Sequence, residues 1–151
     1  MNEMSKVSPE NITAKQLDDE VPVTYGTEAF LSAEYAKAEK ELLWPRVWQQ
    51  AGRLEDIPNV GDYFTYEICD DSVIIIRTKE GSGPDAIKAF YNVCAHRGRV
   101  LVDVPDGSNG VRGNTRNFVC GFHGWTYDIE GKNVYILDQD DWHGALNTDC
   151  T

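Results

Sequence analysis

The chain has 151 residues, with 25 acidic and 14 basic side chains and a formal net charge of -11 at pH 7. That length is typical of one domain, and the 41% of apolar residues can build a hydrophobic core. The acidic balance argues against a nucleic-acid partner held through phosphate contacts. The strongest apolar run, residues 73–76, is far shorter than the roughly 20 residues of a membrane helix, and no secretory signal opens the chain. We therefore expect a cytoplasmic protein with no membrane partner, in which the four cysteines indicate metal binding before disulfides.

Residues 1–45 are predicted to form an N-terminal arm and a helix. Residues 1–26 are polar, contain two prolines and show no sustained period, which favours an extended arm. An alanine-rich helix should follow, with Thr27 as its N-cap, and Pro45 should end it.

Residues 46–137 are predicted to be mainly β, with short strands separated by turns. β-branched and aromatic residues define these strands, and Asp70-Asp71 provides a tight turn between two of them. This pattern is typical of a small antiparallel β-sandwich or barrel. Residues 138–151 are predicted to be an acidic, solvated exit segment. The predicted strands are residues 47–52, 63–68, 72–78, 86–92, 118–119, 125–128 and 134–137.

Two loops carry the residues with metal chemistry. One contains Cys94 and His96 at C-x-H spacing, and the other contains Cys120 and His123 at C-x-x-H spacing. Two thiolates and two imidazoles can hold either a zinc ion or a two-iron, two-sulfide cluster. The His-x3–5-His spacing of zinc fingers is absent, and a glycine follows each pair, where it would let the backbone approach bridging sulfides. The context therefore favours the cluster.

The two loops resemble the signature of a Rieske [2Fe-2S] domain of the kind found in the large (alpha) subunits of aromatic-ring-hydroxylating oxygenases. The sequences that carry this resemblance are Cys-Ala-His-Arg-Gly and Cys-x-x-His-Gly-Trp-Thr-Tyr-Asp, and the similarity extends over about residues 25–137. The resemblance implies a Rieske-type β fold. It also implies that Cys94 and Cys120 bind one iron and that His96 and His123 bind the other.

By the same resemblance, the domain would receive single electrons from a ferredoxin or reductase. It would pass them to a mononuclear non-haem iron in a catalytic domain of the same or a neighbouring subunit, within a homotrimer or hetero-oligomer. We expect that catalytic domain to be missing from this chain, which would then transfer electrons but have no catalytic residue. Asp140 and His143 cannot supply the missing iron site, because it needs two histidines besides His96 and His123.

Two alternative functions remain open at this point. A freestanding Rieske-type ferredoxin would use the same cluster, and a zinc-bound structural module would use the same four donors.

A locally basic stretch also has two interpretations. It could dock an acidic electron donor, or its arginines could be ordinary surface side chains. Its basic residues are Arg97, Arg99, Arg112 and Arg116.

Overall fold

The computed structural model describes residues 26–108, 110–137 and 139–146. The predicted arm up to residue 25, Asp138 and residues 147–151, with Cys150, lie outside the described residues. The chain divides into two compact units, one that ends at Gln49 and one that begins at Gln50. In the described part of the chain, no helix has the length and apolar character needed to cross a membrane.

The first unit is helical and begins at Glu28, directly after the predicted N-cap residue, but an extended residue, Ser32, divides the predicted helix in two. Thr27 makes no side-chain cap on the short helix α1 (Glu28–Leu31). Instead the Ser32 side chain accepts hydrogen bonds from two backbone N–H groups at the start of α2 (Ala33–Ala38), because its own backbone is extended. A π turn, η2 (Glu39–Leu43), and a 3-10 turn, η3 (Trp44–Arg46), complete the helical segment at the predicted proline.

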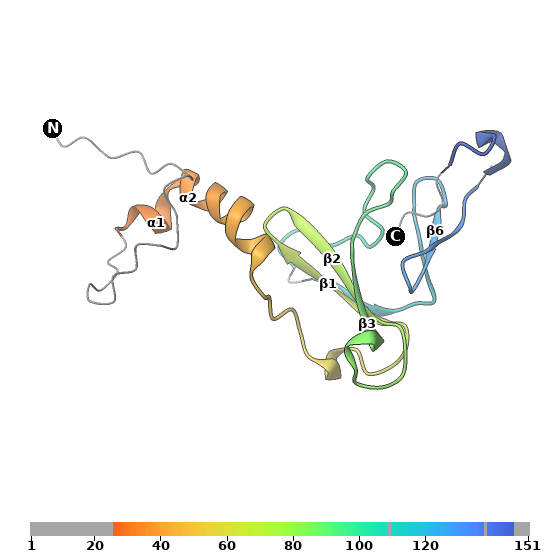
Figure 1. Cartoon of the computed structure of the whole chain (residues 1–151), viewed down its shortest axis with the longest axis horizontal. Helices are drawn as coiled ribbons and strands as arrows, with labels where there is room; N and C mark the ends of the chain where they lie inside the picture. The colour runs from red at the N-terminus through yellow and green to blue at the C-terminus, as the bar shows by residue number, and fades with distance from the viewer. Residues whose placement is uncertain (1–25, 109, 138, 147–151) are drawn as a thin grey trace. The chain divides into compact units, whose positions relative to one another are not determined.

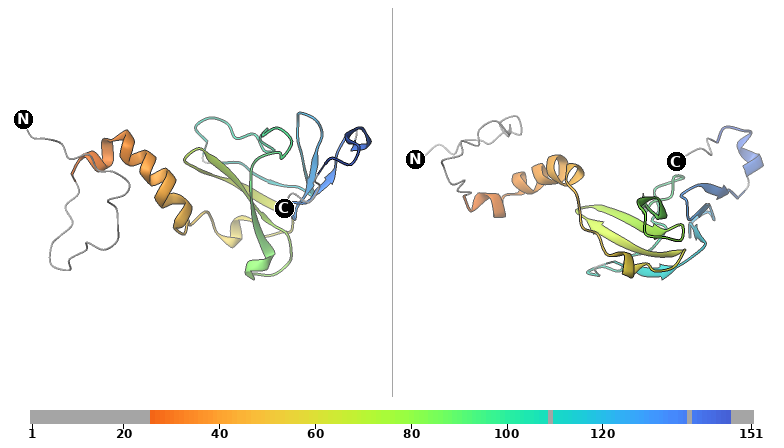
Figure 2. Two further views of the ribbon diagram at one scale, coloured as in Figure 1. Left: turned by 45° about the horizontal axis from the view of Figure 1, so that its top comes forward. Right: turned by 60° about the horizontal axis from the view of Figure 1, so that its bottom comes forward.

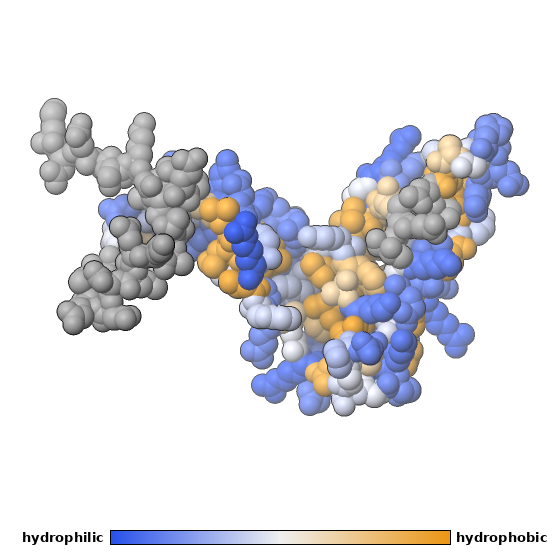
Figure 3. Space-filling model, in the orientation of Figure 1, coloured by the Kyte–Doolittle hydropathy of each residue, from blue (hydrophilic) through white to orange (hydrophobic). Residues whose placement is uncertain are grey.

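Several large apolar side chains of this helical unit face solvent and form orange areas in Figure 3. Phe30 and Leu31 are 80% and 84% exposed, and Leu42 and Leu43 are partly exposed.

The second unit contains a four-stranded antiparallel sheet in the order β3-β2-β1-β4, of which β1, β2 and β3 are labelled in Figure 1. A two-residue turn at Cys69 and Asp70 joins the first two strands, and Cys69 adopts a positive φ of 53° there. The strands are β1 (Asp62–Ile68), β2 (Asp71–Arg77), β3 (Ile87–Tyr91) and β4 (Arg112–Asn114).

A three-stranded antiparallel sheet follows in the order β5-β6-β7, drawn in cyan to blue in Figure 2. Its strands are β5 (Asn117–Val119), β6 (Thr126–Asp128) and β7 (Asn133–Tyr135). The remaining elements are the 3-10 turns η4 (Leu54–Asp56), η5 (Pro84–Ala86) and η6 (Gln139–Trp142).

One hydrophobic core joins the two sheets. Ile74 and Ile76 alternate along β2, are fully buried and pack with Phe118 of β5. Both motif cysteines, Cys94 and Cys120, belong to the same buried cluster. The core therefore holds the two thiol groups away from water.

The mainly β architecture predicted from the sequence is confirmed, with strands at six of the seven predicted places. The strand predicted at residues 47–52 is wrong, because these residues pair with no strand in the described chain. The sequence pattern missed β4, whose Arg-Gly-Asn sequence has low strand propensity. A Cβ atom on Gly113 would lie 2.7 Å from the Tyr63 hydroxyl, so close packing against β1 explains this glycine.

Candidate metal centre

The two motif loops have the same backbone structure, although their histidines occupy different positions. In each loop the cysteine N–H donates to the carbonyl group five residues later, and a glycine N–H donates to the cysteine carbonyl group. Gly98 and Gly124 have φ values of +71° and +70°, a conformation that favours glycine. The four bonds are Cys94 to Arg99 at 2.7 Å, Cys120 to Trp125 at 2.8 Å, Gly98 to Cys94 at 2.9 Å and Gly124 to Cys120 at 3.0 Å.

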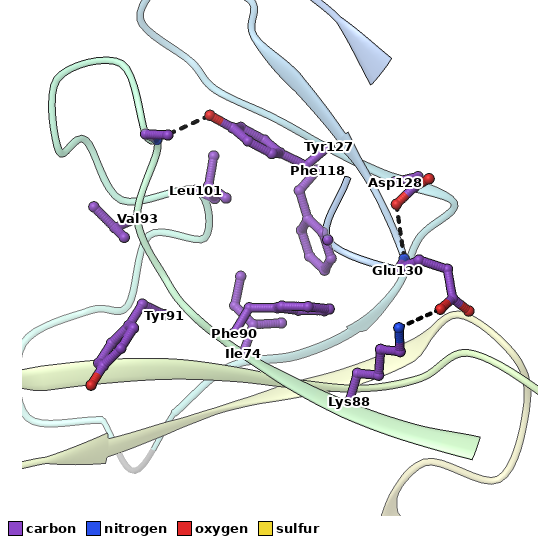
Figure 4. Close-up of a pocket in the computed structure, with 12 residues that line it drawn as sticks. Ile74, Lys88, Phe90, Tyr91, Val93, Leu101, Phe118, Tyr127, Asp128 and Glu130 are labelled. Carbon is purple, nitrogen blue, oxygen red and sulfur yellow. Dashed lines mark hydrogen bonds and ion pairs between the residues drawn. The ribbon is translucent and has the colours of Figure 1, made fainter. Parts of the chain in front are cut away.

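Tyr127 of β6 ties the first loop to the second sheet. Its hydroxyl oxygen lies 3.3 Å from the Cys94 sulfur and accepts the Ala95 N–H at 3.0 Å (Figure 4). Burial, and then the hydrogen bond with Cys94, raise the pKa of Tyr127. This hydroxyl group therefore stays protonated and is able to donate to a thiolate.

The Cys120 sulfur lies in a cluster of hydrogen-bond donors. Burial by itself raises the pKa of Cys120, but the backbone N–H groups of Phe122 and His123 and the Cys94 side chain hydrogen-bond to it. These bonds outweigh burial, so the pKa of Cys120 lies below its ordinary value. The two cysteines are therefore direct neighbours, and the environment of Cys120 favours the thiolate form that binds metals.

The two histidine rings lie beside each other, with their centroids 4.7 Å apart and their planes at 65°. His96 also stacks on the buried Trp125, with centroids 4.8 Å apart and planes only 7° from parallel. Partial burial, followed by the charges of His123 and Arg97, lowers the pKa of His96. His96 is thus held as a neutral imidazole, the form that ligates a metal.

His123 has an unsatisfied ring nitrogen. Its Nδ1 atom is buried and has no hydrogen-bond partner, while its ring packs on Phe122 with centroids 3.8 Å apart. A buried polar atom without a partner is costly and calls for a specific explanation. A metal ion bound at Nδ1 would satisfy it.

The donor set fits a two-iron cluster better than one zinc ion. The four donors form two neighbouring pairs, two sulfurs and two imidazoles. A two-iron cluster divides its ligands in this way, whereas a tetrahedral zinc ion needs all four donors around one point.

Comparison with known proteins agrees with this geometry. The model of the Rieske [2Fe-2S] domain matches residues 47–143, which is more than half of the chain. The chain belongs to the Rieske [2Fe-2S] domain family. The cofactor of this domain is therefore a [2Fe-2S] cluster.

Relatives of this Rieske domain are oxygenase components. The large oxygenase component of the naphthalene 1,2-dioxygenase system of Pseudomonas putida is 36% identical over 118 residues, which cover 78% of this chain and 24% of the relative. The alpha subunit of biphenyl dioxygenase from Paraburkholderia xenovorans (strain LB400) is 35% identical, over 65% of this chain and 19% of its own length. The chain thus spans about a quarter or less of the length of these curated relatives.

Solved structures show the same fold. A naphthalene 1,2-dioxygenase bound to phenanthrene superimposes with a TM-score of 0.65 at 34% identity, over 78% of this chain and 24% of that chain. The Rieske domain is therefore similar in fold as well as in sequence to the corresponding part of a ring-hydroxylating enzyme.

Two of the four motif-region arginines are engaged in ion pairs. Arg99 pairs with Asp103 at 2.9 Å, and Arg112 pairs with Asp56 at 2.8 Å. Neither pair tests the docking of an acidic electron donor on this stretch, which stays a prediction.

Sequence reasoning missed the role of the segment after β7. The prediction of a solvated exit segment is only partly correct, because Trp142 contacts two aromatic rings of the site and Leu146 packs against the core. The only sequence signal was one tryptophan among acidic residues.

Proposed function

We propose that this chain is the electron-transfer part of the large subunit of a ring-hydroxylating oxygenase. In this proposal Cys94 and Cys120 hold one iron of the cluster, and His96 and His123 hold the other. The observation that carries it is the pairing of two buried thiols with two adjacent imidazoles, one of which has an orphaned nitrogen. The bound cluster would supply storage for one electron.

The surrounding residues suit this role. Tyr127 and the backbone N–H groups of the second loop donate toward the sulfurs, where they stabilise negative charge. The two sulfurs are buried, whereas both histidines are half-buried and thus nearer to solvent. We infer that electrons enter and leave on the histidine side.

The partners belong to the same proposal. A ferredoxin or reductase would supply electrons, and a mononuclear non-haem iron in a catalytic domain of the same or a neighbouring subunit would receive them. The large-subunit relatives support this arrangement, since each extends far beyond the part that this chain matches. An aromatic or similarly apolar substrate and a homotrimeric or hetero-oligomeric enzyme complete the proposal. We also propose that the chain is divided into an arm with a helix (residues 1–45), the Rieske domain (residues 46–137) and an exit segment (residues 138–151). The proposed location of the protein is the cytoplasm.

The test is spectroscopic analysis of the chain purified without air. We expect iron and sulfide, and a visible spectrum that bleaches on reduction with dithionite. We also expect a midpoint potential between about -150 and +300 mV, against about -400 mV for a cluster held by four cysteines. Cys94→Ser and His123→Ala should abolish the cluster. Cys69→Ser, which changes an exposed free cysteine, is the matched control and should leave it intact.

Two outcomes would contradict the assignment. A colourless protein with stoichiometric zinc would identify a zinc-bound structural module. A full visible spectrum in Cys94→Ser would show that the assignment of the cluster ligands is wrong. The DNA sequence that follows the gene segment for this chain distinguishes the oxygenase from a freestanding ferredoxin. An in-frame continuation encoding Asp-x-x-His and a further histidine supports the oxygenase.

A further inference from the structure

Aromatic rings enclose His96 on several sides. Trp125 lies parallel to its face, and His123 lies against its edge. Trp142 adds a third ring, with its centroid 5.8 Å from that of His96 and its plane at 84°. Trp142 also contacts Trp125 edge-on, with centroids 6.4 Å apart. One side chain from beyond the last strand therefore contacts both rings of the stacked pair.

The segment that carries Trp142 is held by local and long-range contacts. The His143 N–H donates to the Asp140 carbonyl group at 3.2 Å, and the Ala145 N–H donates to the Trp142 carbonyl group at 2.9 Å. Leu146 then packs against the hydrophobic core. The tryptophan is thus presented by a closed turn with an apolar contact on its C-terminal side.

Trp142 is partly buried by this arrangement, with 39% of it exposed, although acidic residues precede it in η6. Burying indole surface against His96 and Trp125 removes water from that side of the imidazole and restricts rotation of its ring. We propose that Trp142 is a positioning residue, which orients His96, shields it from water and thereby sets the reduction potential of the site. This inference rests on the proposed function, because it takes His96 to be an iron ligand.

The direction of the effect follows from charge. The oxidised two-iron, two-sulfide core would carry a charge of 2+, so two thiolates and two neutral imidazoles would leave the oxidised site uncharged and the reduced site with one negative charge. Water stabilises the charged form more than the uncharged form. Replacing Trp142 with a small residue should therefore favour reduction and raise the potential.

The experiment is a redox titration at pH 7 of the whole chain with its cluster. Trp142→Ala should raise the equilibrium constant for reduction threefold to tenfold, which is about 28–59 mV for one electron. It should also speed the loss of visible absorbance to an iron chelator. In Trp142→Phe, the equilibrium constant for reduction and the rate of cluster loss to the chelator should both lie within about twofold of the wild-type values. Tyr135→Ala removes a 54%-exposed aromatic side chain of β7 outside this group of rings, and it should change neither value.

The outcomes separate this inference from the proposed function. A wild-type chain without a Rieske spectrum refutes the proposed function and the inference with it. A normal wild-type cluster whose potential and chelator sensitivity are the same in Trp142→Ala refutes this inference alone. If Trp142→Ala cannot retain the cluster, Trp142→Gln is compared with Trp142→Phe. A higher potential only in Trp142→Gln supports shielding, and equal potentials overturn it.

Discussion

Asn92 should stabilise the first motif loop more than any other polar side chain near it. It is 3% exposed and directly follows β3. Its amide nitrogen donates to the Ser72 hydroxyl at 3.0 Å and to the Val102 carbonyl group at 2.7 Å. Its amide oxygen accepts the N–H groups of Leu101 and Val102 at 3.0 and 2.8 Å. All four hydrogen-bonding positions of the amide are used, and they join the chain before the loop to the chain after it.

Asn92→Ala would remove these four bonds and leave three backbone groups of Leu101 and Val102 without their partner. At a net contribution of about 0.5–1.5 kcal/mol for each bond, and with water replacing part of it, we expect a loss of about 2–4 kcal/mol. For a urea dependence of about 2 kcal/mol per molar, the unfolding midpoint should fall by about 1–2 M. Hydrogen exchange of peptides that contain residues 101 and 102 should accelerate about 30-fold to several-hundred-fold.

Ser72→Ala is the matched control for this prediction. It removes one of the four bonds and an exposed bond from the Ser72 hydroxyl to Glu67, and it leaves both amide protons of residues 101 and 102 paired, so it should cost about 1 kcal/mol. Both variants are measured with the cluster bound and under anaerobic conditions. Equal losses of unfolding free energy in Asn92→Ala and Ser72→Ala, or unchanged hydrogen exchange at residues 101 and 102, would refute the prediction that the Asn92 side chain stabilises this loop.

Two further predictions concern the same domain. Tyr127→Phe removes a hydrogen bond to the Cys94 sulfur, so the cluster should persist with a lower midpoint potential in a redox titration; an unchanged or higher potential would count against the bond. Gly110→Ala and Gly81→Ala both place alanine at a positive φ, of 107° and 102°, which should cost about 1–2 kcal/mol in each. Of these two positions, only Gly110 would bring the new Cβ against another atom, the Thr65 carbonyl oxygen. Urea unfolding should therefore show a further loss of about 1–3 kcal/mol there, and equal losses in the two variants would contradict this reading.

Local sequence determined the elements whose causes are local. The alternating residues of β2 and the turn at Asp70 predict a hairpin, because the side-chain period of a strand is visible in the chain itself. The four candidate ligands could be named for a similar reason. Their residue types and short spacings within each loop already restrict the chemistry to soft and imidazole donors.

The tertiary structure alone decided which distant residues meet. Strand β4 forms because Gly113 leaves room against Tyr63, and the strand predicted at residues 47–52 does not form because no neighbour pairs with it. The contact between Trp142 and His96 joins positions 46 residues apart. Its cause is the packing of a turn against a folded domain, and no periodicity in the sequence encodes it. The spacing of ligand residues within one loop can be read directly from the sequence, whereas contacts between loops form only when the core has formed.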